Sequence, residues 1–244
     1  TIGGTIASGL SGPSRPYRGS VRDFVLGVTC VNGRGESLRF GGQVMKNVAG
    51  YDVSRLMVGA MGTLGAILDV SFKVLPVPES EQTQVYEVSE EMAIEKMNEW
   101  AAQPWPLSAA CYLKNELRIR LSGTEVGVAA ATRELGGAQH REGEFFWQAL
   151  REQCLPFFKS ADVLWRLVVP PATPPLGLVG DTLVDWGGAQ RWLSTSQGDD
   201  AVRAAVQAVD GYATRFRGGD RSLNVFHPLE PGVSKLHQNL KNAF

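Results

Sequence analysis

The residues best suited to hold a ligand are small and lie at the start of the sequence. The run TIGGTIASG contains Gly3, Gly4, Thr5, Ala7, Ser8 and Gly9. A backbone without bulky side chains lets a ligand approach closely and presents amide N–H groups to a diphosphate. The same glycines can also serve only to shape tight turns, and their spacing alone does not separate the two interpretations.

Other chemical signatures are missing from the sequence. It has no GxGxxG after a strand-like run, no GxxxxGK[ST], no GxSxG and no HExxH, which disfavours Rossmann enzymes, P-loop NTPases, α/β-hydrolases and zincins. His140, His227 and His237 form no pair at metal-ligand spacing, so no metal site is expected. The three cysteines lie far apart without a CxxC pair, which argues against a disulfide framework or an iron–sulfur cluster held by this chain alone. A reducing compartment, the cytoplasm, fits best.

The composition describes a globular protein of one or two domains. The chain has 244 residues, 43% hydrophobic and 20% charged, which excludes a disordered or collagen-like chain. With 24 Lys+Arg against 25 Asp+Glu the net charge is -1, so there is no electrostatic case for nucleic acid as a partner. The most apolar segment, residues 164–179, contains four prolines and cannot form a membrane span.

The chain divides into two regions near Pro76, where two prolines precede a polar stretch. In the first region, 1–78, the run Phe24–Val31 and the run Ser37–Phe40 flank Asn32-Gly33, which predicts a β-hairpin. A short helix is expected over Asp52–Gly59, then a glycine-rich loop and a strand over Ala66–Val74.

The second region, 79–244, alternates strand-like and helical runs. Strands are predicted over residues 83–88, 109–114, 117–121, 164–169, 182–186, 191–194 and 212–217, and helices over 90–102, 125–135, 144–154 and 199–209. Because only Asn115-Glu116 separates two of the strands, the sheet should be mainly antiparallel. The pattern is typical of an α+β sandwich built from two ferredoxin-like halves.

Three segments taken together resemble a known flavoprotein superfamily. They read TIGGTIASG, RPYRGSVRDFVLGVTCVNGRGESLRFGG and KNVAGYDVSRLMVGAMGTLGAI, and resemble the second half of the FAD-binding domain of the vanillyl-alcohol-oxidase/PCMH superfamily. Within it the chain is most similar to the FAD-binding subunits of bacterial glycolate oxidases, through WRLVVPP, DWGGAQRWL and HPLEPGVSKLHQNLKNAF. The resemblance implies an α+β fold, with the C-terminal half of a PCMH-type domain over 1–78 and an α+β cap with a mainly antiparallel sheet over 79–244.

The resemblance also implies a cofactor site. The segment Thr1–Gly9 would run along the flavin with backbone contacts to the ribityl-diphosphate region, and the backbone of Gly65 and Ile67 would meet the adenine edge. Lys46, Gly50 and Tyr51 belong to a motif that packs the neighbouring loop, and packing without cofactor contact is at least as good an interpretation of them. Catalytic residues cannot be assigned, because Met61 stands where catalytic relatives carry an acidic residue and no paired-histidine metal site is present.

In the second region, the cap, Arg166 lies on an otherwise apolar strand. A buried arginine needs an anionic partner, and here that is either a ligand or a structural carboxylate such as Asp181 or Asp185. Other polar or aromatic cap residues that could face the flavin are Trp186, Arg191, Arg215, Arg217 and His227.

The function implied is that of an FAD-binding subunit of a complex that oxidises glycolate and related 2-hydroxy acids. Its expected partners are a larger FAD-containing catalytic subunit and an iron–sulfur subunit, in the cytoplasm or peripherally at the inner face of the bacterial membrane. The family's phosphate-cradling loop would precede Thr1 and its last flavin-contacting motif would follow Phe244, so this stretch by itself is expected to bind FAD weakly or not at all. Two alternatives are a non-catalytic interaction subunit with a vestigial flavin fold and a free-standing FAD-dependent alcohol or sugar oxidase.

Overall fold

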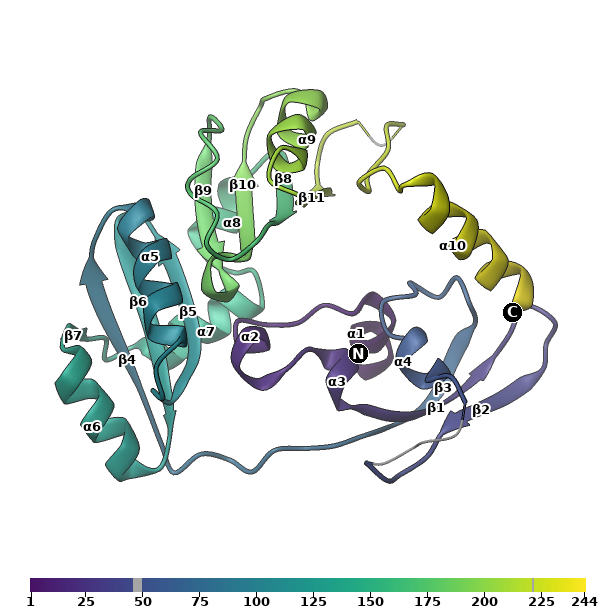
Figure 1. The fold of residues 1–244 in the computed structure, drawn as a ribbon, viewed down its shortest axis with the longest axis horizontal. Coiled ribbons are helices and arrows are strands. Elements are labelled where there is room, and N and C mark those ends of the chain that lie inside the picture. The colour runs from purple at the N-terminus through teal and green to yellow at the C-terminus, as the bar shows by residue number, and fades with distance from the viewer. Residues whose placement is uncertain (46–49, 221) are drawn as a thin grey trace. The chain divides into compact units, whose positions relative to one another are not determined.

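The computed structural model describes residues 1–45, 50–220 and 222–244, which form two compact units (Figure 1). Unit 1 comprises Thr1–Val77 and Leu229–Phe244, and unit 2 comprises Pro78–Pro228. The predicted boundary after residue 78 lies within one residue of the end of the first segment of unit 1. The end of the chain differs from the prediction, because Leu240 and Phe244 pack against the core of unit 1.

Unit 1 combines short helices with a small antiparallel sheet. Its helices are Ile2–Ser8 (α1), Arg15–Arg18 (α2), Val21–Phe24 (α3), Val53–Leu56 (α4) and Pro231–Ala243 (α10), and its strands are Val25–Val31 (β1), Ser37–Gly41 (β2) and Ala66–Phe72 (β3), in the order β2-β1-β3. The predicted hairpin is confirmed as β1 and β2. Its turn is closed by the Asn32 side chain, whose Oδ1 accepts from the N–H groups of Arg34 and Glu36, both at 3.0 Å.

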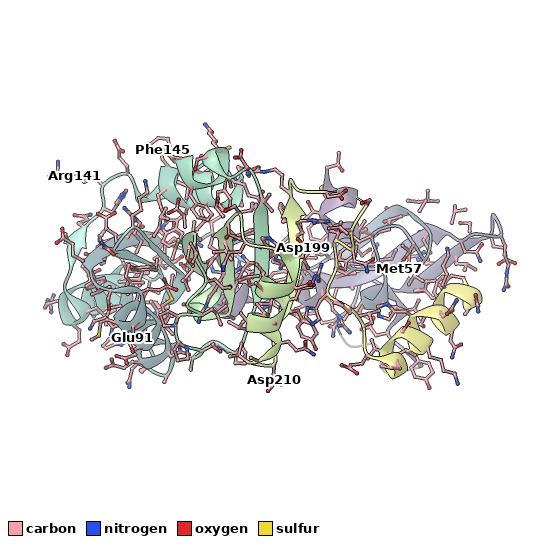
Figure 2. All side chains as sticks on the ribbon, turned by 90° about the horizontal axis from the view of Figure 1, so that it is seen from above. Met57, Glu91, Arg141, Phe145, Asp199 and Asp210 are labelled. Carbon is pink, nitrogen blue, oxygen red and sulfur yellow. The ribbon has the colours of Figure 1, made fainter. Side chains whose placement is uncertain are left out.

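The core of unit 1 lies on one face of this sheet. It is formed by Ile6, Val25, Val28, Cys30, Met57 and Leu64, and Met57 is labelled in Figure 2. The C-terminal end of α10 joins this core through Leu240 and Phe244. The Gly33 N–H also donates to the Phe244 carbonyl at 3.1 Å, and the rings of Phe40 and Phe244 lie 6.1 Å apart. The hairpin therefore anchors the end of the chain.

Unit 2 is an eight-stranded sheet with helices. Its strands are Ser80–Glu87 (β4), Leu107–Leu113 (β5), Glu116–Gly123 (β6), Ala138–Gln139 (β7), Leu164–Val168 (β8), Asp181–Asp185 (β9), Gln190–Ser194 (β10) and Tyr212–Arg217 (β11). Its helices are Glu90–Ala101 (α5), Glu125–Leu135 (α6), Gly143–Arg151 (α7), Pro156–Ser160 (α8) and Asp199–Gln207 (α9), with a 3-10 turn at Trp186–Gly188 (η1). The side chains of Ser89 and Thr124 cap α5 and α6, whose predicted extents are nearly those observed.

The sheet order shows two ferredoxin-like halves. It reads β11-β8-β10-β9-β5-β6-β4-β7. Counted outward from the β9–β5 junction, the second, third, first and fourth strand of each half follow in the same order, as in a ferredoxin-like fold. Neighbouring strands among the described residues pair antiparallel, and Cys111 lies opposite Asp185 at the junction. The predicted α+β cap with a mainly antiparallel sheet is confirmed. The second half replaces one crossover helix with the proline-rich stretch 169–180.

Each face of this sheet packs against different helices. Trp165 and Leu167 of β8 pack with Val202 and Val206 of α9. Leu164, one residue earlier, instead packs with residues of α7 and α8. Because side chains alternate along a strand, Arg166 lies on the same face as Leu164. Within the described ranges, no helix has the length and apolar character needed to cross a membrane.

Candidate functional site

The predicted ligand-binding stretch at the start of the chain is a helix, whereas its sequence pattern indicates a ligand-contacting backbone or tight turns and no helix. Residues Ile2–Ser8 form α1, and the Thr1 hydroxyl caps it by accepting from the Gly4 N–H at 3.2 Å. Gly9 ends it in the left-handed conformation, with φ 63°. The low helix propensity of glycine concealed this helix, which is stabilised by its cap and by tertiary contacts.

The glycine-rich loop after α4 closes onto the end of α1. The Gly59 N–H donates to the Ile6 carbonyl at 3.0 Å, and the Met61 N–H donates to the Ala7 carbonyl at 2.8 Å. A Cβ added at Gly9 would lie 3.0 Å from the Gly59 Cα. The structure thus brings together the two glycine-rich segments that the sequence singled out, and it assigns Gly9 a packing role.

The start of α1 has an open, side-chain-poor surface. Gly3, Gly4 and Thr5 are exposed, Ala7 and Ser8 are half-buried, and a Cβ at Gly3 would meet no atom within 4 Å. No carboxylate side chain occurs before Asp23, whereas three arginines do. A large anionic group could therefore approach the backbone at Gly3 without meeting a side chain, and α1 itself carries no acidic residue, so the predicted contact with the phosphate-bearing part of FAD stays a prediction that this surface allows.

Gly65 and Ile67 lie against β1. A Cβ at Gly65 would lie 2.6 Å from the Val31 carbonyl oxygen, so close backbone packing already explains this glycine. Ile67 pairs with Cys30 in the sheet, and its side chain packs against the core. Their contact with the adenine edge stays a prediction.

The motif of Lys46, Gly50 and Tyr51 is expected to pack the neighbouring loop. Tyr51 is 98% exposed and therefore does not pack against the protein. Lys46 lies outside the described residues.

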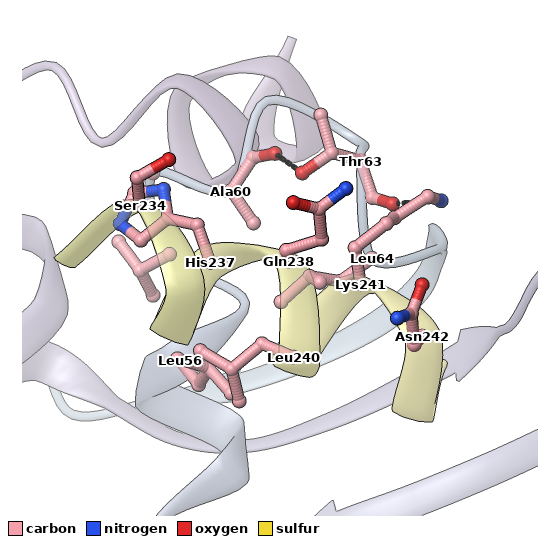
Figure 3. Close-up of a pocket in the computed structure, with 12 residues that line it drawn as sticks. Leu56, Ala60, Thr63, Leu64, Ser234, His237, Gln238, Leu240, Lys241 and Asn242 are labelled. Carbon is pink, nitrogen blue, oxygen red and sulfur yellow. Dashed lines mark hydrogen bonds between the residues drawn. The ribbon is translucent and has the colours of Figure 1, made fainter. Parts of the chain in front are cut away.

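A cavity of about 640 Å³ lies in unit 1 between helix α10 and the segment that contains the end of α4 and the glycine-rich loop after it (Figure 3). Its lining is shared between residues 56–64 and α10, namely Leu56, Val58, Gly59, Ala60, Thr63, Leu64, Ser234, His237, Gln238, Leu240, Lys241 and Asn242. Lys241 Nζ donates to the Thr63 carbonyl. Local sequence patterns give no sign of this cavity, because its two walls come from segments more than 170 residues apart.

Unit 2 contains a buried chain of polar side chains. Arg166 Nε donates to Gln190 Oε1 at 2.7 Å, and Gln190 Nε2 lies 3.5 Å from Asp185 Oδ2. The Trp186 N–H donates to Asp185 Oδ1 at 2.7 Å. Burial raises the pKa of Asp185 to about 7, against the lowering effects of these hydrogen bonds and of the Arg166 charge. Of the two carboxylates considered for Arg166, Asp185 is the one to which it is connected.

The other arginines predicted to face a ligand have structural partners. Arg191 is 1% exposed and donates to the carbonyls of Thr173, Pro174 and Gly188. Arg215 forms an ion pair with Asp199 at 2.9 Å, and Asp199 is labelled in Figure 2. Arg217 donates to the Phe158 carbonyl, and His227 Nδ1 accepts from the Ala213 N–H at 3.4 Å. In the part of the chain that the structure describes, no group of three or more potential metal ligands occurs.

Comparison with known proteins identifies the family. No family model matches the chain. It is 49% identical over 241 residues to glycolate oxidase subunit GlcE of Escherichia coli strain K12, a match that covers 99% of this chain and 67% of that protein. The chain belongs to the GlcE family of glycolate oxidase subunits. The predicted resemblance is thereby confirmed.

Two further matches concern part of this GlcE-family chain and its fold. The chain is 42% identical over 83 residues to glycolate oxidase subunit GlcD of Bacillus subtilis strain 168. This match covers 34% of this chain and 18% of that protein. The structure aligns with alkyldihydroxyacetonephosphate synthase with a TM-score of 0.62 and 14% identity, over 100% of this chain and 56% of that one. The predicted fold class is confirmed. The predicted cofactor agrees with a third match, 34% identical over 76 residues, to an uncharacterized FAD-linked oxidoreductase of Mycobacterium tuberculosis, which covers 31% of this chain and 17% of that protein.

Proposed function

We propose that this GlcE-family chain holds FAD non-covalently within a complex that oxidises glycolate and related 2-hydroxy acids to 2-oxo acids. The observation that carries the proposal is the open surface at the start of α1, beside the loop that bonds to its last carbonyls. When bound, FAD supplies an acceptor for the hydride removed from the α-carbon of the hydroxy acid.

The residues assigned to the cofactor would contribute mainly by their small size, since the N–H groups of Gly4 and Thr5 already donate to Thr1. Gly3, Gly4 and Thr5 would face the diphosphate, because their surface is exposed and no acidic side chain lies in α1. Ala7 and Ser8 would border the ribityl chain, and Gly9 would hold the helix end against Gly59. Gly65 and Ile67 would present their backbone to the base.

The chain needs partners to pass electrons on. Cys30 and Cys111 are buried, and within the described residues no metal-ligating group could hold an iron–sulfur cluster. We therefore assign one-electron transfer to an iron–sulfur subunit and substrate oxidation to a larger FAD-containing subunit, in line with the match to GlcD. Free thiols support a cytoplasmic location, with the complex at most peripheral to the inner face of the membrane.

The test compares Gly3→Leu with Gly3→Ala in the assembled complex. The leucine would occupy the open space beside α1 without disturbing a packed neighbour, whereas the alanine adds only a Cβ. We expect the leucine variant to lose one FAD per complex, measured by absorbance after extraction, and the alanine variant to keep it. Full FAD occupancy in a correctly assembled Gly3→Leu complex would show that this surface does not hold the cofactor.

A non-catalytic interaction subunit is the second candidate function. Met61 is 57% exposed, and the resemblance implies that it stands where catalytic relatives carry an acidic residue. This role predicts that the wild-type subunit contributes no FAD to the complex but that its deletion releases the catalytic subunit. Turnover of the purified subunit alone with an artificial acceptor would instead favour a free-standing oxidase.

A further inference from the structure

Helix α10 stands away from the surface beneath it along most of its length. Its residues 231–239 are all exposed, and only Leu240 and Phe244 near its end are partly buried. The space that this leaves beside residues 56–64 is the cavity of about 640 Å³. That volume lies within the range of sites for small organic ligands, roughly 300 to 1,000 Å³.

The walls of the cavity differ in chemistry. Leu56, Val58, Ala60 and Leu64 provide an apolar wall on the side of α4 and the following loop. The opposite wall, on α10, is polar except for Leu240, and Figure 3 shows Gln238 and Lys241 extending from the helix toward the loop that carries Ala60 and Thr63. A ligand that fills this space needs an apolar body with a polar end.

The charge of the lining selects the sign of that end. Lys241 provides a cation, and none of the lining residues is Asp or Glu. Its Nζ already donates to the Thr63 carbonyl, which holds the ammonium at the edge of the cavity, where two further donor hydrogens remain. A charge-assisted hydrogen bond from a lysine to an anion is about twice as strong as a neutral one.

We propose that this cavity binds an amphipathic anion, whose carboxylate or sulfonate pairs with Lys241 and whose apolar body lies on Leu56, Val58 and Ala60. No residue of α1 lines the cavity, so the proposal does not depend on the flavin assignment. The ligand class follows from the charge of Lys241 and from the apolar wall. A neutral alcohol of the same length could pack on the apolar wall but would not pair with the lysine.

The first test titrates the full chain with 1-anilinonaphthalene-8-sulfonate, an amphipathic anion that fluoresces when its apolar rings leave water. We expect one bound probe per chain. The variant Lys241→Gln should bind the probe about tenfold more weakly. Lys235→Gln is the matched control, since Lys235 is an exposed lysine of the same helix outside the cavity. Equal weakening in both variants would overturn the assignment of the anion to Lys241.

The second test distinguishes the cavity from exposed apolar surface. Ala60→Phe places a ring in the cavity and should abolish probe binding, whereas Leu236→Ala removes an apolar side chain that is 56% exposed on α10 outside it. Decanoate should displace the probe from the wild-type chain at concentrations at least tenfold below those needed with decan-1-ol. Several probes per chain, unchanged binding in Ala60→Phe, or equal displacement by the acid and the alcohol would each overturn the proposal.

Discussion

The Arg166 guanidinium donates to the Gln190 side chain at 2.7 Å, and through it reaches a buried carboxyl group on the neighbouring strand. That group, Asp185, is 3% exposed and has a pKa of about 7 because burial disfavours its charged form. Asp185 precedes a sharp turn at Trp186, and its carboxyl group accepts a hydrogen bond from the Trp186 N–H. The φ of Trp186 is 55°, a value that is rare for a residue with a large side chain. The stability of this part of unit 2 should therefore depend on pH.

Asp185→Asn should flatten that dependence. The folded protein keeps the Asp185 proton to a higher pH than the unfolded chain, in which an aspartate titrates near 4. The free energy of unfolding should thus fall as the pH rises from about 4 to about 7, by up to about 4 kcal/mol for a difference of some three pKa units. Urea unfolding at several pH values measures this, and a slope equal to that of wild type in the asparagine variant would contradict it.

Arg166→Met should move the same transition to higher pH. The positive charge of Arg166 lowers the pKa of Asp185 against the effect of burial, so its removal leaves the carboxyl group protonated over a wider range. The midpoint of the pH-dependent loss of stability should rise above that of wild type. Arg133→Met, at an exposed position of α6, serves as the control and should leave the midpoint in place. A downward shift in Arg166→Met would refute the link.

Local signals explain the elements that the sequence predicted. Asn32-Gly33 between two β-rich runs predicts the hairpin, and its side-chain bonds to Arg34 and Glu36 are all within five residues. Ser89 and Thr124 likewise cap α5 and α6 from the adjacent residue. The short helices α2, α3 and α8, of four or five residues each, were not predicted, because their periodicity is too brief to detect.

Non-local contacts explain what the sequence did not predict. Helix α1 contains two glycines, and its last carbonyls accept from Gly59 and Met61, about 50 residues away. The candidate site residues were identified by their small size, but their helical arrangement depends on those contacts. The same holds for the cavity beside α10, since the Lys241–Thr63 contact joins residues 178 positions apart.

Gly65→Ala should destabilise unit 1 more than Gly62→Ala. An added Cβ at Gly65 would lie 2.6 Å from the Val31 carbonyl oxygen, and relieving that overlap requires backbone movement. We expect a loss of about 2 kcal/mol in the free energy of unfolding, within the usual cost of overpacking. At Gly62 the space is open and only the φ of 75° opposes a side chain, which costs about 1 kcal/mol. Equal losses in the two variants, measured by urea unfolding, would argue against close packing at Gly65.

Phe244→Ala should release α10 while the rest of unit 1 stays folded. The helix is attached near its C-terminal end, where the Phe244 ring meets Phe40 and Leu240 joins the core. Because Phe244 is only partly buried, its truncation should cost about 2 kcal/mol, less than the roughly 3 to 5 kcal/mol of a fully buried phenylalanine. Amide hydrogen exchange should accelerate throughout α10 and change little in β1. Val233→Ala is the control, since Val233 is 44% exposed and far from the anchor in sequence, and it should leave exchange unchanged. Protection of α10 in Phe244→Ala equal to that in the wild-type chain would show that other contacts hold the helix in place.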